Sequence, residues 1–293
     1  MQSWDLDRKV RVTQTRIIEW LLRYDNQVYV GFSGGKDSTV LLDIVRRIDS
    51  SIKAAFCNTG LEYPEIVDFV KTIDNVKELK PKMSYPKVIE TYGYPVIGKE
   101  QAAFIQEYRD TKSEKLRDIR WNGNKYGRGK ISEKWKFLVD APFKISDKCC
   151  DIMKKEPSKR FEKETGLHPI LGTTTDESAQ RLSNWFMYGC NAFDKGRPTS
   201  QPLSFWTEQD ILQYIKEASI PYAKIYGDIV KEDGVLKCTG EPRTGCITCM
   251  FGCQHEKEPN KFQRMKITHP ERYNYCINGC KQGMVMDYIG VKY

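Results

Sequence analysis

Strand and helix patterns alternate through the first quarter of the chain. Apolar residues at helical spacing over 12–24 predict a helix, and the apolar run over 28–32, which follows a turn, predicts a buried strand. The alternation continues with a helix predicted over 39–48, a strand over 52–57, and a helix over 64–73 that starts with a proline. Strands that alternate with helices in this way predict an α/β fold with a doubly wound, mostly parallel sheet.

The same pattern returns in the second half of the chain. A strand is predicted over 168–173 and helices over 176–187 and 207–219, the last of which starts like a capping box. Residues 104–137 break this rhythm with Lys, Arg, Gly and single aromatic residues. That composition indicates an insertion or a long loop outside the core.

The chain of 293 residues is long enough for one large α/β domain with an appendage. From residue 238 onward it is rich in Cys, Gly and polar residues and has few periodic runs, as expected of a segment organised around a metal site. We therefore expect a main domain over 1–237 and a Cys-rich C-terminal segment over 238–293 packed on it.

Composition narrows the class of protein. No apolar run approaches the roughly 18 residues that a membrane span needs, and acidic residues stand where an export signal is basic and apolar. We therefore expect a cytoplasmic protein with no membrane partner. The net charge of +8 favours anionic partners, although a mildly basic solvated surface accounts for it equally well. Ten cysteines in such a chain indicate thiols, metal ligands or redox groups rather than disulfides.

A glycine-rich turn between the first predicted strand and its helix is the strongest chemical signal. Backbone amides and a helix N-terminus at such a turn point toward an anion, and glycines let the backbone approach it closely. The lysine supplies positive charge, the aspartate suits Mg²⁺, and the serines offer hydroxyls. A glycine turn without a ligand is the alternative. The candidate phosphate-binding residues are Ser33, Gly34, Gly35, Lys36, Asp37 and Ser38.

This turn, FSGGKDS over 32–38, resembles the PP-loop of the N-type ATP pyrophosphatases and of their relatives in the phosphoadenosine phosphosulfate (PAPS) reductase family. Segments 58–64, 176–181 and 202–222 follow the order of that family, so the resemblance covers roughly residues 10–253. It implies an adenine nucleotide alpha hydrolase-like fold that binds ATP with Mg²⁺. By this likeness Phe56, Thr59 and Gly60 lie by the adenosine, and the candidate catalytic residues are Lys36, Asp37 and Arg181.

The resemblance also separates two branches. Reductases of activated sulfate typically replace the Gly-Gly-Lys stretch that ATP pyrophosphatases keep, and this chain keeps it at 34–36. Splitting ATP between its α and β phosphates would leave an adenylylated substrate, with Lys36 and Mg²⁺ stabilising the pyrophosphate. One departure is that Gly172 precedes three threonines where family members often have Gly-x-Arg. The missing arginine counts more against activated sulfate than against ATP.

Four cysteines resemble the Cys-Cys and Cys-x-x-Cys segments that hold a [4Fe-4S] cluster in adenylylsulfate reductases. They are Cys149, Cys150, Cys246 and Cys249. Nearby lysines would offset the negative charge of the cluster. Structural Zn²⁺ and unligated thiols are the alternatives.

The nucleophilic cysteine of sulfonucleotide reductases lies in a C-terminal Glu-Cys-Gly motif, which this chain lacks. Cys276 and Cys280 are the late cysteines that could replace it, and neither has an adjacent base.

Residues 109–136 carry ten Lys or Arg against four Asp or Glu, interleaved with Trp121, Tyr126 and Trp135. Positive charge with aromatic side chains suits DNA or tRNA, and a solvated loop is the alternative.

Three functions remain open on these residues. The first hypothesis is an ATP pyrophosphatase that adenylylates a substrate as a step in sulfur transfer. The expected acceptor is nucleic acid, and the expected partner is a sulfur donor protein or a reductant. The second is a sulfonucleotide (APS or PAPS) reductase. The third is a nucleotide-binding module with structural zinc.

Overall fold

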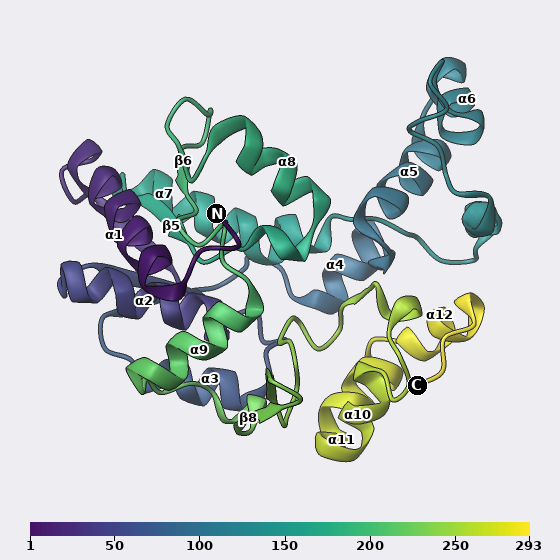
Figure 1. Cartoon of the computed structure of the whole chain (residues 1–293). Coiled ribbons are helices and arrows are strands. Elements are labelled where there is room, and N and C mark those ends of the chain that lie inside the picture. The colour runs from purple at the N-terminus through teal and green to yellow at the C-terminus, as the bar shows by residue number, and fades with distance from the viewer. The chain divides into compact units, whose positions relative to one another are not determined.

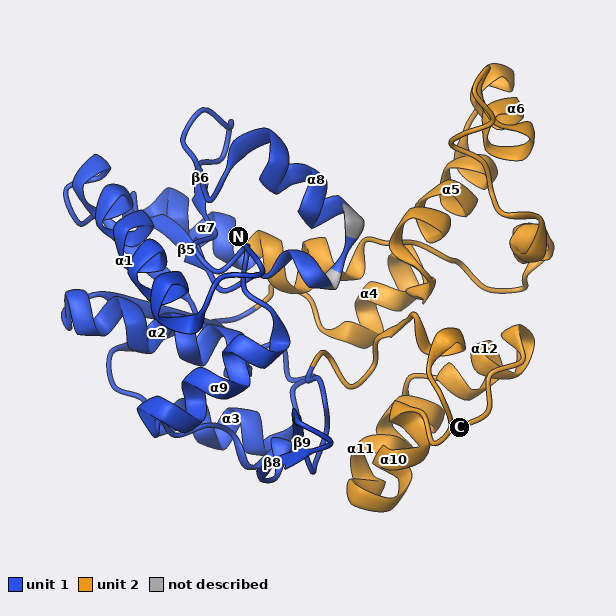
Figure 2. Ribbon diagram, in the orientation of Figure 1, with its two compact units in different colours: residues 1–80, 157–244 blue, residues 81–156, 245–293 orange. Residues whose placement is uncertain are grey.

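The computed structural model describes all of the chain except residues 177 and 179. It forms two compact units, each built from two stretches of sequence (Figures 1 and 2). Unit 1 comprises residues 1–80 and 157–244, and unit 2 comprises 81–156 and 245–293. Among the described residues, no helix combines the length and the apolar character needed to cross a bilayer.

A six-stranded sheet forms the centre of unit 1. The strands stand in the order β3-β2-β1-β5-β7-β6, and all neighbours are parallel except β6 and β7. Their bounds are β1 Val28–Gly31, β2 Lys53–Cys57, β3 Val76–Leu79, β5 His168–Leu171, β6 Asn191–Ala192 and β7 Thr199–Ser200. The predicted α/β fold with a mostly parallel sheet is confirmed. Chain order reverses at β1, which has β2 on one side and β5 on the other, and such a switch point is where open α/β sheets bind ligands.

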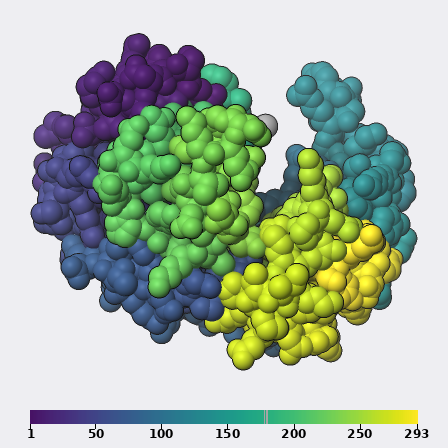
Figure 3. Space-filling model, turned by 60° about the horizontal axis from the view of Figure 1, so that its bottom comes forward, coloured from purple at the N-terminus to yellow at the C-terminus, as the bar shows by residue number. Residues whose placement is uncertain are grey.

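Helices pack around this sheet. They are α1 Leu6–Arg23, α2 Lys36–Ile48, α3 Pro64–Lys71, α7 Glu156–Thr165, α8 Ala179–Tyr188 and α9 Glu208–Ala218, with a β8–β9 hairpin of Ile229–Glu232 and Val235–Cys238. Helices α1, α2 and α9 contact one another (Figure 1). The space-filling view shows the segment that contains α9 and the hairpin, in green, on the surface of unit 1 (Figure 3). Helix α1 begins earlier than its apolar pattern predicts because Asp5 caps it, accepting from the amide of Arg8.

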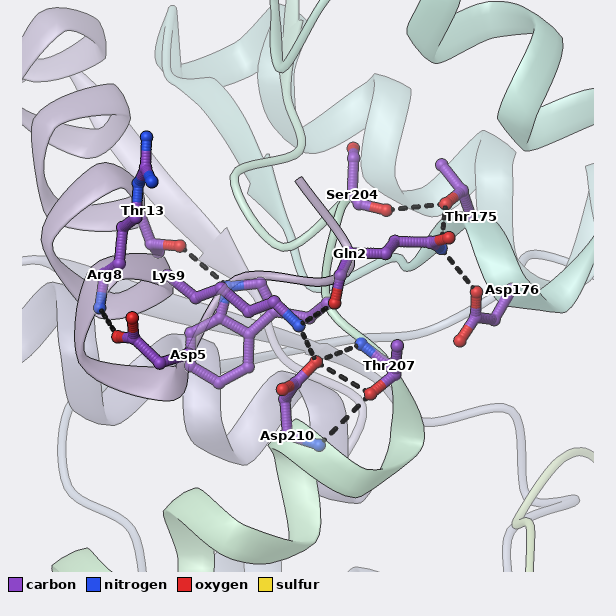
Figure 4. Close-up of polar contacts among 11 residues, drawn as sticks. Gln2, Asp5, Arg8, Lys9, Thr13, Thr175, Asp176, Ser204, Thr207 and Asp210 are labelled. Carbon is purple, nitrogen blue, oxygen red and sulfur yellow. Dashed lines mark hydrogen bonds and ion pairs between the residues drawn. The ribbon is translucent and has the colours of Figure 1, made fainter.

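A buried polar network joins the N-terminus to α9 (Figure 4). The Nζ of Lys9, which is 1% exposed, donates to Asp210 Oδ2 and to the carbonyl of Gln2, both at 2.6 Å. The same Asp210 oxygen accepts from the amide and the hydroxyl of Thr207, which completes the predicted capping box of α9. Gln2 also donates to Asp176 Oδ1 at 2.6 Å.

Unit 2 is mainly helical and contains one small parallel sheet. Strand β4 Val96–Ile97 pairs with β10 Met250–Phe251. The helices are α4 Tyr85–Tyr92, α5 Lys99–Asp110, α6 Glu114–Asn122, α10 Lys261–Thr268, α11 Pro270–Asn274 and α12 Gln282–Ile289, with a 3-10 helix over Glu133–Asp140.

The structure corrects three expectations about this part of the chain. Residues 104–137 are not a long loop, because α5, α6 and the 3-10 helix occupy most of them. The Cys-rich segment 238–293 is also largely helical. In place of a boundary at 237, the first stretch of unit 2 joins 245–293 through the β4–β10 pair, which local sequence patterns do not reveal.

The network around Lys9 leads to a stability prediction. Lys9→Met keeps the length of the side chain but leaves the Asp210 carboxylate without its cation. Removing one partner of a buried ion pair costs about 3 to 5 kcal/mol, and we expect a loss near the lower value because the Asp210 side chain is 12% exposed. Urea unfolding followed by circular dichroism measures the change. Lys71→Ala, which opens the exposed pair with Asp68, is the matched control and should cost less than about 1 kcal/mol. Equal losses in the two variants would contradict this assignment.

Candidate functional site

The glycine-rich turn lies between β1 and α2 as predicted, at the carboxyl end of the central strand. Gly34 has φ +71°, and a Cβ there would lie 2.8 Å from Ile66 and 2.9 Å from Val70 of α3. Glycine is therefore required by both conformation and space. Gly172, which follows β5, packs against the start of α2, where a Cβ would meet the carbonyl oxygen of Asp37 at 3.0 Å.

Hydroxyl groups hold the turn in its shape. The hydroxyls of Ser33 and Ser38 lie 3.0 Å apart, and the Ser33 amide donates to Ser38 Oγ at 3.2 Å. Ser38 Oγ in turn donates to the carbonyl of Gly35 at 2.9 Å. These bonds make the turn a preformed cradle at the N-terminus of a helix of 13 residues, where the helix dipole favours an anion.

A cavity of about 500 Å³ opens over the turn, entirely within unit 1. Its volume lies in the range of sites for small ligands. The turn supplies Ser33, Gly35, Lys36, Asp37 and Ser38 to the lining. Later parts of the chain supply Gly172, Thr173, Thr174, Asp176, Arg181, Glu208, Ile211, Tyr226, Pro242, Arg243 and Thr244.

Lys36 is the buried cation of this cavity, with 5% exposure. Its Nζ lies 2.8 Å from Glu208 Oε1, 3.0 Å from the carbonyl of Pro242 and 3.8 Å from Cys238 Sγ. The Glu208 carboxylate is therefore the anionic partner of the Lys36 ammonium. Glu208 itself is 61% exposed in its side chain, so a ligand can replace it at modest cost.

Two arginines and one aspartate complete the charge distribution. Burial lowers the pKa of Arg181, and the nearby Arg243 lowers it further. Burial also raises the pKa of Asp37, against the opposing effects of its own backbone, Lys36 and Arg243. An anionic ligand would relieve the repulsion between the two guanidinium groups.

The structure brings together part of the predicted nucleotide site. Lys36, Asp37 and Arg181, the candidate catalytic residues, line the cavity together with Ser33, Gly35 and Ser38. Phe56, Thr59 and Gly60 are not among the described lining residues, and their contact with adenosine stays a prediction. Thr59 instead donates to Glu62 Oε1 at 2.7 Å. In the family-like segment 176–181, residues 177 and 179 lie outside the described residues.

Three of the polar lining residues that sequence analysis did not predict are Glu208, Tyr226 and Arg243. Glu208 is the first residue of α9. Tyr226 belongs to no recognisable sequence motif, but its hydroxyl accepts a hydrogen bond from the Lys36 amide at 3.4 Å. Arg243 stands three residues before Cys246 and lines the cavity. It supplies a positive charge there, whereas the threonines that follow Gly172, where family members often have an arginine, supply no charge. Its position just before a Cys-x-x-Cys segment was the only available signal.

The four candidate ligand cysteines all belong to unit 2, and β4 explains how their segments meet. The β4–β10 pair places residues 250–251 beside 96–97, directly after Cys249. On the other side, Tyr94 and Ile145 form a bridge, a few residues before Cys149. Gly93 permits this approach, since a Cβ there would lie 2.4 Å from the carbonyl carbon of Lys144.

Cys149 and Cys150 contact each other, and both cysteines of the second segment affect the pKa of Cys149. The Sγ atoms of Cys149 and Cys150 lie 4.0 Å apart. The pKa of Cys149 is raised by its hydrogen bond to Cys150, by burial, and by the charges of Cys150, Cys249 and Cys246. The hydrogen bond from Cys149 lowers the pKa of Cys150 to about 6, with help from Lys99 and from two lysines of the following turn.

The Cys-x-x-Cys turn is held from outside. The amide of Cys249 donates to the carbonyl of Cys246 at 3.0 Å, and Lys261 Nζ donates to both of their carbonyls, at 3.3 Å for Cys246 and 2.6 Å for Cys249. In the part of the chain that is described, no three His, Cys, Asp or Glu side chains converge closely enough to hold a single metal ion.

Three further cysteines of unit 2 are almost fully buried. Burial raises the pKa of Cys253 to about 11 and that of Cys276 to about 12, and it also raises the pKa of Cys280. A thiol with a raised pKa and no access to solvent is a poor nucleophile. Neither Cys276 nor Cys280 is therefore a good replacement for a C-terminal nucleophile.

Residues 27–120 and 99–250 match the family model of the phosphoadenosine phosphosulfate reductase domain. The chain belongs to this family. Its membership confirms the resemblance drawn from the PP-loop, and it makes the protein a nucleotide-binding enzyme of sulfur metabolism.

Curated relatives in this family match most of the chain. The adenosine 5'-phosphosulfate reductase of Staphylococcus haemolyticus is 26% identical over 226 residues, which cover 76% of this chain and 75% of the relative. Adenosine 5'-phosphosulfate reductase 2 of Bacillus subtilis is 24% identical, with coverage of 78% and 79%.

Among solved structures, the phosphoadenylyl-sulfate reductase of Candida auris, in its phosphate complex, aligns with a TM-score of 0.41 at 17% identity, over 75% of this chain and 88% of that one. The U34-tRNA thiolase NcsA of Methanococcus maripaludis, with its [4Fe-4S] cluster, aligns with a TM-score of 0.39 at 14% identity, over 95% and 80%.

The cradle geometry leads to a prediction with a matched control. Gly34 and Gly60 have nearly the same positive φ, +71° and +75°, but among described atoms only a Cβ at 34 meets neighbours within 4 Å. An alanine costs about 1 to 2 kcal/mol at either position through its backbone conformation. Gly34→Ala adds overpacking against α3, so we expect it to lose roughly 1 kcal/mol or more beyond Gly60→Ala in urea unfolding. The same loss in both variants would show that α3 does not confine the turn.

Proposed function

We propose that unit 1 binds an adenylyl sulfate in the cavity over the phosphate loop and that the protein reduces it. The observation that carries this proposal is the position of Cys238, a half-buried thiol 3.8 Å from the Nζ of Lys36. Two of the most similar curated relatives are named adenosine 5'-phosphosulfate reductases and align with three quarters of this chain or more, which supports the same reaction.

The cavity would bind the substrate through its positive charges and amide groups. The loop amides and the α2 N-terminus would bind one anionic group, and Arg181 and Arg243 would bind others. A phosphate or sulfate oxygen would take the place of the Glu208 carboxylate at Lys36. The substrate therefore exchanges one ion pair for another rather than meeting an uncompensated buried charge.

The thiol step balances as follows. The Cys238 thiolate attacks the sulfur atom of the adenylyl sulfate, a sulfur–sulfur bond forms, and the bond from sulfur to the phosphate oxygen breaks. AMP leaves with the electron pair. A dithiol reductant then attacks Cys238 Sγ and releases sulfite, and its second thiol restores Cys238 as the reductant becomes a disulfide.

The environment of Cys238 fits this role in part. Burial raises the pKa of the thiol, and the Lys36 ammonium works in the opposite direction. Glu208 adds to the rise. The Lys36 ammonium, whose Nζ donates to Cys238 Sγ, is therefore the group that would favour the thiolate.

Cys149, Cys150, Cys246 and Cys249 would hold a [4Fe-4S] cluster in unit 2, as the resemblance implies. Their mutual coupling, the lysines beside Cys150 and the carbonyl-bound Lys261 fit a thiolate set of negative charge. Four thiolates are the donor set that such a cluster takes. When bound, the cluster would supply a redox-active centre of negative charge.

A second candidate function is adenylylation with ATP and Mg²⁺, and the intact Gly-Gly-Lys stretch at 34–36 favours it. A substrate oxygen would attack the α phosphorus, and the bond to the β phosphate would break. Pyrophosphate would then leave, with Lys36 and the loop amides stabilising its charge. Asp37, which lines the cavity, would share Mg²⁺ with the phosphates. Nucleic acid and a sulfur donor protein would be the partners of this reaction.

One assay separates the two candidates. Purified protein is given adenosine 5'-phosphosulfate with a dithiol, or ATP with Mg²⁺, and sulfite, AMP and pyrophosphate are measured. We expect sulfite and AMP, which Cys238→Ser should abolish while Cys190→Ala, a buried thiol of the same unit, leaves them unchanged. Lys36→Ala should cost about 2 to 4 kcal/mol of transition-state stabilisation in either reaction. Pyrophosphate without sulfite would establish the second candidate, and nucleotide binding without any product would leave only a binding module.

The cluster has its own test. Anaerobically purified protein should be brown and contain iron and acid-labile sulfide in comparable amounts. Cys149→Ser or Cys249→Ser should lose both, because each removes a thiolate of the set. Cys57→Ser, in unit 1, should retain them and serves as the control. Stoichiometric zinc without sulfide would convert the site to a structural metal site.

A further inference from the structure

The basic stretch from Arg109 to Lys136 divides into inward and outward side chains. Arg109 donates four hydrogen bonds to the carbonyls of Leu138, Val139, Ala141 and Phe143, which makes it a structural clamp. Arg120 pairs with Glu107 and also donates to the carbonyl of Gly129 at 2.7 Å. Lys130 and Lys136 both lie beside Glu133.

Six basic side chains of the stretch point outward instead. They are Lys112, Lys115, Arg117, Lys125, Arg128 and Lys134. Among the described residues, none of the six takes part in an ion pair. Their charge therefore lies at the surface of unit 2, where Lys125 Nζ also stands 4.9 Å from the centroid of the Tyr126 ring.

The aromatic residues divide in the same way. Trp135 is 8% exposed, and Trp121 packs against Tyr108 at 5.3 Å between ring centroids with Lys136 over its face. Both tryptophans therefore belong to the packing of unit 2, and neither is free to receive a base. Tyr126 is 72% exposed and stands between Lys125 and Arg128.

A tight turn over residues 123–130 presents these three side chains. Asn124 Oδ1 accepts from the amides of Tyr126 and Arg128, and the Asn124 amide donates to the Arg128 carbonyl at 2.8 Å. The three glycines of the turn, at 123, 127 and 129, have positive φ, which lets it close. The turn is thus ordered without a ligand, so presenting Tyr126 costs little further entropy on binding.

From this arrangement we propose that the 123–130 turn binds single-stranded nucleic acid. Lys125 and Arg128 contact phosphates, and Tyr126 stacks on a base. A flexible single strand fits because its unpaired base can reach an exposed ring, which a base inside a duplex cannot. The proposal is independent of the reaction catalysed in unit 1.

Fluorescence anisotropy of the full chain with labelled single-stranded DNA and RNA, over a series of salt concentrations, tests this surface. Each phosphate contact contributes about 0.7 to the slope of log K against log salt. Lys125→Ala with Arg128→Ala should therefore lower the slope by roughly 1.4. Tyr126→Phe keeps a ring and should bind like the parent, whereas Tyr126→Ala should weaken binding by about fivefold to hundredfold with the slope unchanged.

Lys82→Ala with Lys257→Ala is the matched control, since it removes two exposed charges from unit 2 outside the basic stretch. The proposal is overturned if this control reduces the slope as much as the turn variant does. A second outcome also overturns it: heparin binds as tightly as single-stranded nucleic acid, and Tyr126→Ala changes the affinity for neither. The surface would then be a general binding site for polyanions. Preference for duplex over single strand would likewise exclude base stacking on Tyr126.

Discussion

The buried ion pair between Lys9 and Asp210 fixes the position of the first turn of α9 relative to α1. One carboxylate oxygen of Asp210 binds both the lysine of α1 and the capping Thr207. Since an unpaired buried charge costs several kcal/mol, α1 and the first turn of α9 are held together. That turn carries Glu208, whose carboxylate holds Lys36 in the cavity. The contact between α1 and α9 thus places a partner for Lys36, although it involves no residue of the phosphate loop.

The cavity combines a preformed cradle with three cations, Lys36, Arg181 and Arg243. The loop is closed by its own serine hydroxyls, so its amides need no ligand to adopt their positions. Lys36 has a partner that a ligand can displace, and Arg181 lies near the like charge of Arg243. A multiply charged anion satisfies all three cations at once, which a single carboxylate cannot do. Both sulfonucleotides and ATP are anions of this kind, and our proposal of the first rests on the neighbouring Cys238.

Backbone pairing in unit 2 positions its two cysteine segments, of which the first begins a helical stretch and the second lies in a turn. The short β4 strand pairs with β10 on one side, and the adjacent Tyr94 bridges to Ile145 on the other. Gly93 allows that second contact because any side chain would collide with the backbone of Lys144. The two cysteine segments are therefore positioned by backbone pairing, and Lys261 fixes the orientation of the second.

The sequence by itself determined what depends on neighbours along the chain. Alternating apolar runs predicted the parallel sheet, and a glycine turn between strand and helix predicted the cradle from Ser33 to Ser38, because backbone conformation and amide direction there are local properties. Helices over 99–122 were missed because their buried face, with Ala102 and Ile105, is narrow among many charges.

Only the tertiary structure brought Glu208 and Cys238 to Lys36, across 172 and 202 residues of sequence. It also decided that Tyr126, and neither tryptophan, is exposed in the basic stretch. Both outcomes depend on packing between distant segments, which sets burial and the distance between charges and which no local pattern encodes.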